Sequence, residues 1–144
     1  MARVIIPIPE TFPFFTDLDV YIQHINAGQH LANEQLVALL NEARMRYLAT
    51  LPLQANDIEP RGFIGADLAV IYQSEVRYGD RLRIEVAADD FNKYGCDFVY
   101  RVTSLNNAQP VAIAKMAMLM FDYTNQRLKP VPEGFKALFS GSRS

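Results

Sequence analysis

The chain contains 144 residues, of which 50% are apolar and 21% are charged, and its formal net charge is −2. These values are typical of one globular domain over residues 1–144, and the scattered Lys and Arg form no basic patch for nucleic acid. With one cysteine and two histidines, the sequence excludes an internal disulfide and gives no reason to expect a metal site.

No apolar run approaches the roughly 18 residues that a transmembrane helix requires. The N-terminal segment MARVIIPIPETFPFF is apolar, but it is interrupted by prolines and lacks the small-residue cleavage site of a secretory signal. We therefore expect a cytoplasmic protein that does not associate with membranes.

The first predicted element is a strand over residues 16–24, TDLDVYIQH, because Leu18, Val20 and Ile22 alternate along it and would share one face. The next residues, NAGQ, are typical of a turn, in which Gly28 is free to adopt a positive φ. The two histidines, His24 and His30, flank this turn.

From residue 33 to 51 the hydrophobic period changes to that of a helix. Apolar residues recur every three or four positions and predict one buried stripe, made of Leu36, Leu40, Ala43, Tyr47 and Leu51 and widened by Leu39 and Leu48. Asn33 is the predicted N-cap, Glu34 adds negative charge to the first turn, and Pro52 ends the pattern.

The remaining sequence predicts four strands, over residues 63–76, 81–87, 96–105 and 110–123, and one short helical turn in GFKALF near the C-terminus. Strand, helix and four successive strands predict an α+β fold, in which an antiparallel sheet of about five strands wraps one long helix. The helix can cover only one face of that sheet. We therefore expect a homodimer or homotetramer, joined through the apolar edge strand 63–76.

Two segments carry a resemblance to a known family. NAGQHLANEQLVALLNEARMRYL resembles the helix-entry motif of 4-hydroxybenzoyl-CoA thioesterase-like hotdog proteins, which runs roughly Asp-x-x-Gly-His-Val-Asn-Asn and continues to a Glu-x-Ala-Arg. AVIYQSEVRYGDRLRIEV is similar to the second and third strands of that family. The resemblance implies a hotdog fold and an acyl-CoA thioesterase that uses no cofactor, since CoA is part of its substrate.

Alignment on Glu42-Ala43-Arg44 places His30 at the family's histidine and Asn33 at its second asparagine, and leaves Asn26 where the family has an aspartate. Many members use that Asp as a general base or nucleophile. An amide can do neither, because it has no basic lone pair at neutral pH. The same alignment makes Gly28 and Asn33 candidate substrate-binding residues.

A second alignment is weaker. DLDVYIQHIN resembles a run in plant acyl-carrier-protein thioesterases and would make Asp19 and His24 the active pair. The distance from His24 to Glu42-Ala43-Arg44 is then six residues too long, and the same stretch is already used by the predicted strand.

Each candidate catalytic residue also has a structural interpretation. His30 precedes the helix, where free N–H groups and the dipole favour a developing oxyanion, but it could simply bond to backbone. Asn26 could orient water or donate to a carbonyl, or only stabilise the turn. Glu42 could act as a general base across a dimer interface, or pair with Arg46. Asp67, the one charge in IGADLAVIY, could position water or His30, or be an edge residue with its own partner.

The function that these residues favour is hydrolysis of an acyl-CoA or related acyl thioester. His30 or a nearby carboxylate would activate water, while Asn26 and the first helical N–H groups would hold the carbonyl oxygen. Met116, Met118 and Met120 share one strand face and are candidates for an apolar acyl pocket, or for ordinary core packing. The missing Asp favours an alternative, a protein that binds acyl thioesters without cleaving them. A hydratase or dehydratase is the third function. It ranks last because HINAGQH matches the motif of those enzymes only in part.

Overall fold

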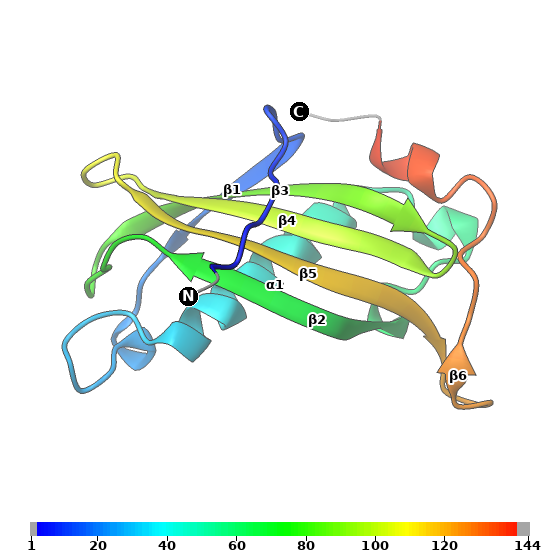
Figure 1. Cartoon of the computed structure of the whole chain (residues 1–144), viewed down its shortest axis with the longest axis horizontal. Coiled ribbons are helices and arrows are strands. Elements are labelled where there is room, and N and C mark those ends of the chain that lie inside the picture. The colour runs from blue at the N-terminus through cyan, green and yellow to red at the C-terminus, as the bar shows by residue number, and fades with distance from the viewer. Residues whose placement is uncertain (1–2, 141–144) are drawn as a thin grey trace.

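The computed structural model describes residues 3–140 and shows one long helix packed behind a curled antiparallel sheet (Figure 1). The predicted architecture is confirmed. The strands are β1 (Phe14–Asp19), β2 (Phe63–Tyr72), β3 (Arg81–Asn92), β4 (Gly95–Ser104), β5 (Pro110–Asp122) and the short β6 (Arg127–Leu128). The helix is α1 (Asn33–Ala49), and four 3-10 turns lie at Ile22–His24, Gln54–Asn56, Pro60–Gly62 and Lys136–Phe139.

The strand order in the sheet is β1-β3-β4-β5-β2, and β6 pairs with β5. All of these pairs are antiparallel. Three consecutive strands, β3, β4 and β5, form the centre, while β2 lies beyond β5 although it precedes β3 in sequence. The predicted strand 63–76 is therefore an edge strand, and the side chains of Leu68 and Tyr72 on it are 43% and 47% exposed.

The predicted stripe of α1 is buried against the concave side of the sheet. Leu36, Leu40 and Ala43 are at most 1% exposed. They pack in one core with inward residues of the central strands, among them Leu82, Ile84, Val86, Tyr100, Val102, Met116, Met118 and Met120. Each buried Leu or Ile contributes about 1.5–3 kcal/mol, so this contact holds the helix on the sheet.

Cys96, at the start of β4, is buried in this core, as its sequence context predicts. Burial is the main cause that raises the pKa of its thiol well above the ordinary range, and the nearby charges of Asp97 and Asp89 act in the same direction. The thiol is therefore neutral at physiological pH.

The opposite face of the sheet carries ion pairs between neighbouring strands. Asp17 of β1 accepts two bonds from Arg83 of β3, at 2.9 and 3.1 Å, and Glu85 of β3 accepts two from Arg101 of β4, at 2.7 and 3.1 Å. The Arg101 guanidinium also lies 4.7 Å from the ring centroid of Phe12, in the N-terminal segment that crosses this face in Figure 1. This face is consequently charged and partly covered by the chain itself.

Two predicted strands end earlier than the hydrophobic pattern indicates. The strand predicted over 16–24 ends at Asp19, because the chain turns into a 3-10 helix at Ile22–His24, and the side chain of Ile22 is 68% exposed. The strand predicted over 63–76 ends at Tyr72, because Gln73 and Ser74 both donate to the carbonyl of Val111, at 2.8 and 3.3 Å. Two successive donors on one acceptor bend the chain away from the sheet.

The start of α1 also differs from the prediction. The N-cap is Ala32 and not Asn33, since the amides of Gln35 and Leu36 both donate to the Ala32 carbonyl at 3.0 Å. Asn33 is instead the first helical residue, and no side chain caps this end. The other predicted strands agree with the structure to within a residue or two, except that β3 continues to Asn92.

Substitution of Asp17 by Asn tests the ion pairs on the outer face. The hydrogen bond from Arg83 lowers the pKa of Asp17, its positive charge and that of Arg81 add to this, and partial burial opposes it. A lowered carboxyl pKa stabilises the fold above the unfolded-state pKa, and this contribution is lost as the pH falls through the folded-state value.

We expect Asp17→Asn to lower the free energy of unfolding by about 0.5–1 kcal/mol at pH 7, and the difference from the unmodified protein to shrink below about pH 4. Urea denaturation at pH 7 and pH 3 measures both. Glu133→Gln is the control, because Glu133 has no ion pair or hydrogen bond within residues 3–140. An equal loss at both pH values would contradict this account.

Candidate active site at the entrance to α1

The loop before α1 is a closed turn that presents His30 at the start of the helix. The amide of Asn26 donates to the carbonyl of His30 at 3.0 Å, and the amide of Gln29 donates to the carbonyl of Asn26 at 3.0 Å. The residue with positive φ in this turn is Gln29, at 73°, and not Gly28 as predicted.

The side chain of Asn26 stabilises the same turn. Its Oδ1 accepts from the amide of Gly28 at 2.9 Å and from the amide of His30 at 3.4 Å. A Cβ on Gly28 would lie 3.2 Å from His30 Nε2 and 3.3 Å from Asn26 Oδ1. Glycine is therefore favoured here by close approach rather than by its backbone conformation, and the amide Nδ2 of Asn26 remains available to donate elsewhere.

Two backbone hydrogen bonds fix the end of the loop. The amide of Leu31 donates to the carbonyl of Val76 at 2.7 Å, and the amide of Ala32 donates to the carbonyl of His24 at 2.9 Å. The first bond joins the helix entrance to the segment that follows β2. As a result, His30 faces residues that lie more than forty positions away in the sequence.

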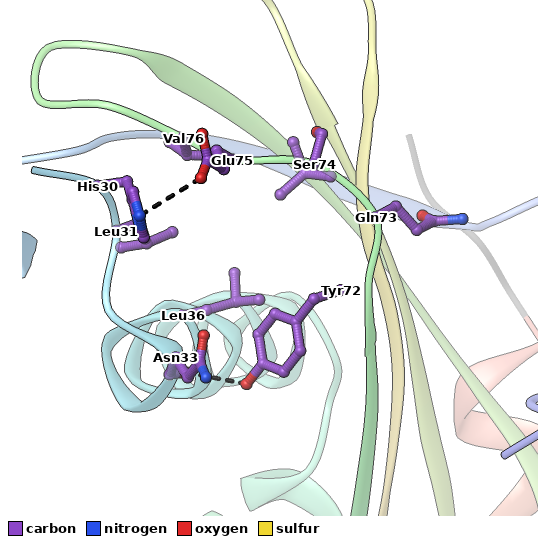
Figure 2. Close-up of a pocket in the computed structure, with 10 residues that line it drawn as sticks. His30, Leu31, Asn33, Leu36, Tyr72, Gln73, Ser74, Glu75 and Val76 are labelled. Carbon is purple, nitrogen blue, oxygen red and sulfur yellow. Dashed lines mark hydrogen bonds and ion pairs between the residues drawn. The ribbon is translucent and has the colours of Figure 1, made fainter. Parts of the chain in front are cut away.

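A cavity of about 290 Å³ lies between the helix start and the end of β2. Figure 2 shows the side chains that surround it. Apolar side chains from three segments of the fold form part of the lining, and polar groups form the rest. The lining residues are His30, Leu31, Asn33, Leu36, Tyr72, Gln73, Ser74, Glu75, Val76 and Val111.

The charged group that faces His30 in this cavity is Glu75. Its Oε2 lies 3.4 Å from His30 Nε2, and the two side chains are 64% and 35% exposed. Figure 2 shows the imidazole and the carboxylate pointing toward one another. The bend after β2 directs the side chain of Glu75 toward His30. The hydroxyl of Ser74 stabilises this bend by donating to the carbonyl of Pro110 at 2.6 Å.

Glu75 was not among the candidates predicted from the sequence. The interpretation of 63–76 as one continuous strand hides it, since it then appears as an ordinary polar position near a strand end. The signal that was present is the polar triplet Gln73-Ser74-Glu75 directly after a long apolar strand, a place where side chains often gather at a site.

Tyr72 joins β2 to the first residue of α1. Its hydroxyl donates to the backbone carbonyl of Asn33 at 3.2 Å (Figure 2). Burial raises the pKa of Tyr72, and the negative charge of Glu34 raises it further. Tyr72 is therefore a neutral hydrogen-bond donor in the physiological range, and Asn33 lines the cavity, where it was predicted to meet a ligand.

The first two helical amides, those of Asn33 and Glu34, donate to no acceptor within the described part of the chain. They lie at the positive end of the macrodipole of a 17-residue helix. Backbone donors at such an end stabilise negative charge without rearrangement. An oxygen that gains charge beside Asn33 would find these donors in place.

Glu42 lies away from the cavity. Its Oε2 accepts from Arg46 Nε at 2.8 Å, and Arg46 also donates to Thr16 of β1 at 2.8 Å. This flank of α1 therefore faces β1, whereas the cavity lies on the flank that faces β2. Within one chain, Glu42 does not join His30.

Asp67 does not reach the cavity either. It pairs in register with Ala117 on the face of the sheet that is turned away from α1, and its carboxylate accepts from Lys115 Nζ at 2.9 Å. The Lys115 hydrogen bond is the largest cause that lowers the pKa of Asp67. The structural interpretation of Asp67, an edge residue with its own partner, matches this position.

His24 is buried and has a structural role. Its Nδ1 accepts from the amide of Tyr21 at 2.9 Å, and its ring stacks on that of Tyr21 with centroids 5.7 Å apart. Asp19, its partner in the second alignment, binds Arg81 at 3.3 Å instead. This geometry counts against a site made of Asp19 and His24.

The described residues contain neither a metal-binding cluster nor a membrane-spanning helix. Between residues 3 and 140, no three or more His, Cys, Asp or Glu side chains are grouped so that they could hold a metal ion. In the same range, no helix combines the length and apolar character needed to cross a membrane.

Solved structures share this fold, whereas no curated protein sequence matches the chain. Slr0204, a 1,4-dihydroxy-2-naphthoyl-CoA thioesterase from Synechocystis, is 17% identical with a TM-score of 0.75, and the match covers 88% of this chain and 94% of that one. A thioesterase from Thermus thermophilus, complexed with coenzyme A and Zn, is 20% identical with a TM-score of 0.77, over 90% and 99% of the two chains.

SAV2348 from Staphylococcus aureus, in complex with CoA, is 13% identical with a TM-score of 0.76, and the match covers 91% of this chain and 86% of that one. These structures confirm the predicted hotdog fold. At the sequence level, the model of the Thioesterase-like superfamily matches residues 18–139, which is most of the chain, and this protein belongs to that superfamily.

Proposed function

We propose that this protein hydrolyses acyl thioesters and that its substrate is an acyl-CoA. The observation that carries the proposal is the His30–Glu75 pair, 3.4 Å apart, at a cavity beside the free amides of α1. Membership of the Thioesterase-like superfamily supports thioester hydrolysis in general. The similarity to two structures that contain CoA supports CoA as the carrier.

In this proposal His30 is the general base. It takes a proton from a water molecule as the water oxygen attacks the thioester carbonyl carbon, and Glu75 stabilises the imidazolium that forms. The amides of Asn33 and Glu34, with Nδ2 of Asn26, hold the oxyanion of the tetrahedral intermediate. The intermediate then collapses, the carbon–sulfur bond breaks, and His30 returns the proton to the departing thiolate.

The size of the cavity limits what it can hold. A volume of about 290 Å³ is near the lower end of ligand pockets, which span roughly 300–1,000 Å³. It accommodates the thioester and the first part of an acyl group. The nucleotide end of CoA must therefore lie outside, beyond the exposed rim formed by His30 and Glu75.

A second copy of the chain completes the proposed enzyme. The β2 edge exposes Leu68 and Tyr72, and an uncovered apolar edge strand favours strand pairing. We infer a homodimer joined at this edge in the cytoplasm, with a homotetramer as the larger alternative. Glu42 and Asp67 receive no role within one chain, so a catalytic contribution from either would require the partner copy.

Substitution of His30 and Glu75 tests the proposed pair. We expect His30→Gln to lower kcat/KM for acyl-CoA hydrolysis by about 10²–10⁴-fold, the usual contribution of a general base. We expect Glu75→Gln to cost about tenfold, because the amide cannot stabilise the imidazolium that forms as His30 takes the proton.

The measurement is thiol release from acyl-CoAs of varied chain length, with Glu133→Gln as the carboxylate control. The proposal is wrong if no acyl-CoA is cleaved above the buffer rate, or if His30→Gln retains full turnover. Full turnover in Glu75→Gln would remove Glu75 alone from the mechanism.

Substitution of Gly28 by Ala tests the close approach in the loop. A Cβ would lie 3.2 Å from His30 Nε2 and push the imidazole away from Glu75. We expect kcat/KM to fall about tenfold, since small misplacements of a catalytic group carry such costs, while the melting temperature changes by only a few degrees. Gly62→Ala is the matched control, because its Cβ would meet only Glu59 Cβ, at 4.0 Å.

A second candidate function is binding of acyl-CoA without cleavage. The observation that favours it is Asn26, which stands where the resembling family has an Asp and whose Oδ1 is already engaged by two backbone amides. Asn26→Asp separates the two functions, because a carboxylate can accept the same two hydrogen bonds and preserve the turn.

If the protein only binds, calorimetry will show acyl-CoA binding with no thiol release, and Asn26→Asp will gain hydrolysis. If it is a hydrolase that relies on His30, we expect turnover in the unmodified protein and a loss of about 10²-fold or more in Asn26→Asp, since one oxyanion donor is replaced by a negative charge.

A further inference from the structure

The cavity beside α1 is polar at its rim and apolar at its inner end. The rim is formed by His30 and Glu75, whose side chains are 35% and 64% exposed. The inner end is formed by Leu36, Val76 and Val111, which are each at most 2% exposed and belong to the apolar core. Such a surface favours an apolar ligand and disfavours a charged one. A thioester whose carbonyl lies at the rim therefore directs its acyl group toward this inner end.

Leu36 closes the cavity on the side of the helix. A helical side chain leans toward the N-terminus of its helix, so the side chain of Leu36 covers the first turn of α1, where the cavity lies. Figure 2 shows it projecting from the helix beside the ring of Tyr72. The next leucines of the buried stripe, Leu39 and Leu40, do not line the cavity. The lining along α1 therefore stops at Leu36.

The ring of Tyr72 forms the wall on the side of the β2 edge. Its hydroxyl donates to the carbonyl of Asn33 at 3.2 Å, which ties the ring to the start of α1 (Figure 2). Without this contact, an acyl chain could leave the cavity over the edge strand, where Leu68 is exposed. With the ring in place, the acyl group is confined between the helix, the strand and the core.

The volume of the cavity limits the number of carbon atoms in the acyl group. A cavity of about 150 Å³ holds one benzene molecule, so six carbon atoms need roughly this volume, and one water molecule needs about 30 Å³. The cavity of this protein has about 290 Å³, part of which the thioester group and the attacking water occupy. The remaining space accommodates an acyl group of about six carbons.

We propose that Leu36 sets the length of the acyl group, so that the preferred substrate is a short, apolar acyl thioester of about six carbons. A longer chain meets the packed side chains of Leu36 and Val111 before its carbonyl reaches His30. Its carbonyl is then displaced from the base and from the oxyanion donors, which slows the reaction. This inference rests on the proposed function for its reaction, but it concerns the acyl end of the cavity and not the catalytic pair.

The test is a series of straight-chain acyl-CoAs that differ by one carbon, for which kcat/KM is measured from thiol release. In the unmodified protein we expect kcat/KM to rise severalfold with each methylene up to about six carbons, because each added methylene is buried. We expect it to fall by at least about tenfold at about ten carbons, because the carbonyl is then misplaced.

Three variants show whether Leu36 sets this optimum. Leu36→Ala removes the volume of about three carbon atoms and should move the optimum to longer chains by about that number. Leu36→Phe fills part of the cavity and should move the optimum to shorter chains, which also covers the case in which Leu36→Ala does not fold. Leu40→Ala is the matched control, because Leu40 is equally buried on the same stripe but does not line the cavity, and it should leave the optimum unchanged.

An optimum that stays at the same length in the Leu36 variants overturns the inference. So does a kcat/KM that continues to rise beyond about ten carbons in the unmodified protein, because the acyl chain would then have another path. If no acyl-CoA is cleaved, the proposed function fails, and calorimetric Kd values for the same series still decide the inference. Tightest binding near six carbons that shifts in Leu36→Ala supports it, whereas Kd values independent of acyl length, or no binding at all, refute it.

Discussion

The backbone hydrogen bond from Leu31 to Val76 joins two segments that are distant in sequence, the entrance of α1 and the chain that leaves β2. Every polar group of the cavity lies close to this junction. Tyr72 and Glu75 precede Val76 by a few residues, while His30 and Asn33 flank Leu31. Tyr72 and Asn33 lie on β2 and α1 themselves, whereas His30 and Glu75 lie on the short segments next to them, so the site is anchored by a strand and a helix.

The two flanks of α1 have different electrostatic roles. On the flank facing β1, the charge of Arg46 is neutralised by Glu42, and Arg46 also donates a hydrogen bond to Thr16. On the flank facing β2, Arg44 has only neutral acceptors within the described residues. The outer face of the sheet resembles the first flank, because its charges are paired between neighbouring strands. Within the described residues, the cation without an acidic partner thus lies on the flank of α1 that faces β2.

Much of this arrangement follows from local sequence. The period of the apolar residues in α1 fixes its buried stripe, and the position of His30 before the helix follows from the turn signals that precede it. The pairing of Glu42 with Arg46 follows from their spacing of four residues. These features depend on neighbours along the chain, so they can be predicted from the sequence alone.

Other features depend on contacts between distant segments and are therefore not visible in a local pattern. β2 ends at Tyr72 because the carbonyl of Val111 on β5 accepts from two successive amides, and the same bend carries Glu75 to His30. Ala32 serves as N-cap because its amide is held by His24. The position of Asp67 on the outer face likewise follows from its pairing with β5. Each of these outcomes requires knowledge of the strand order.

The burial of Cys96 has a practical consequence for assays of thioester cleavage. It is the single cysteine of the chain, and its thiol is both shielded and kept protonated, so it lacks the thiolate that attacks disulfide reagents. A colorimetric reagent for free thiols will therefore register the CoA that is released and not the folded protein. For the same reason, a cysteine introduced at the rim of the cavity can be labelled selectively without first removing the native one.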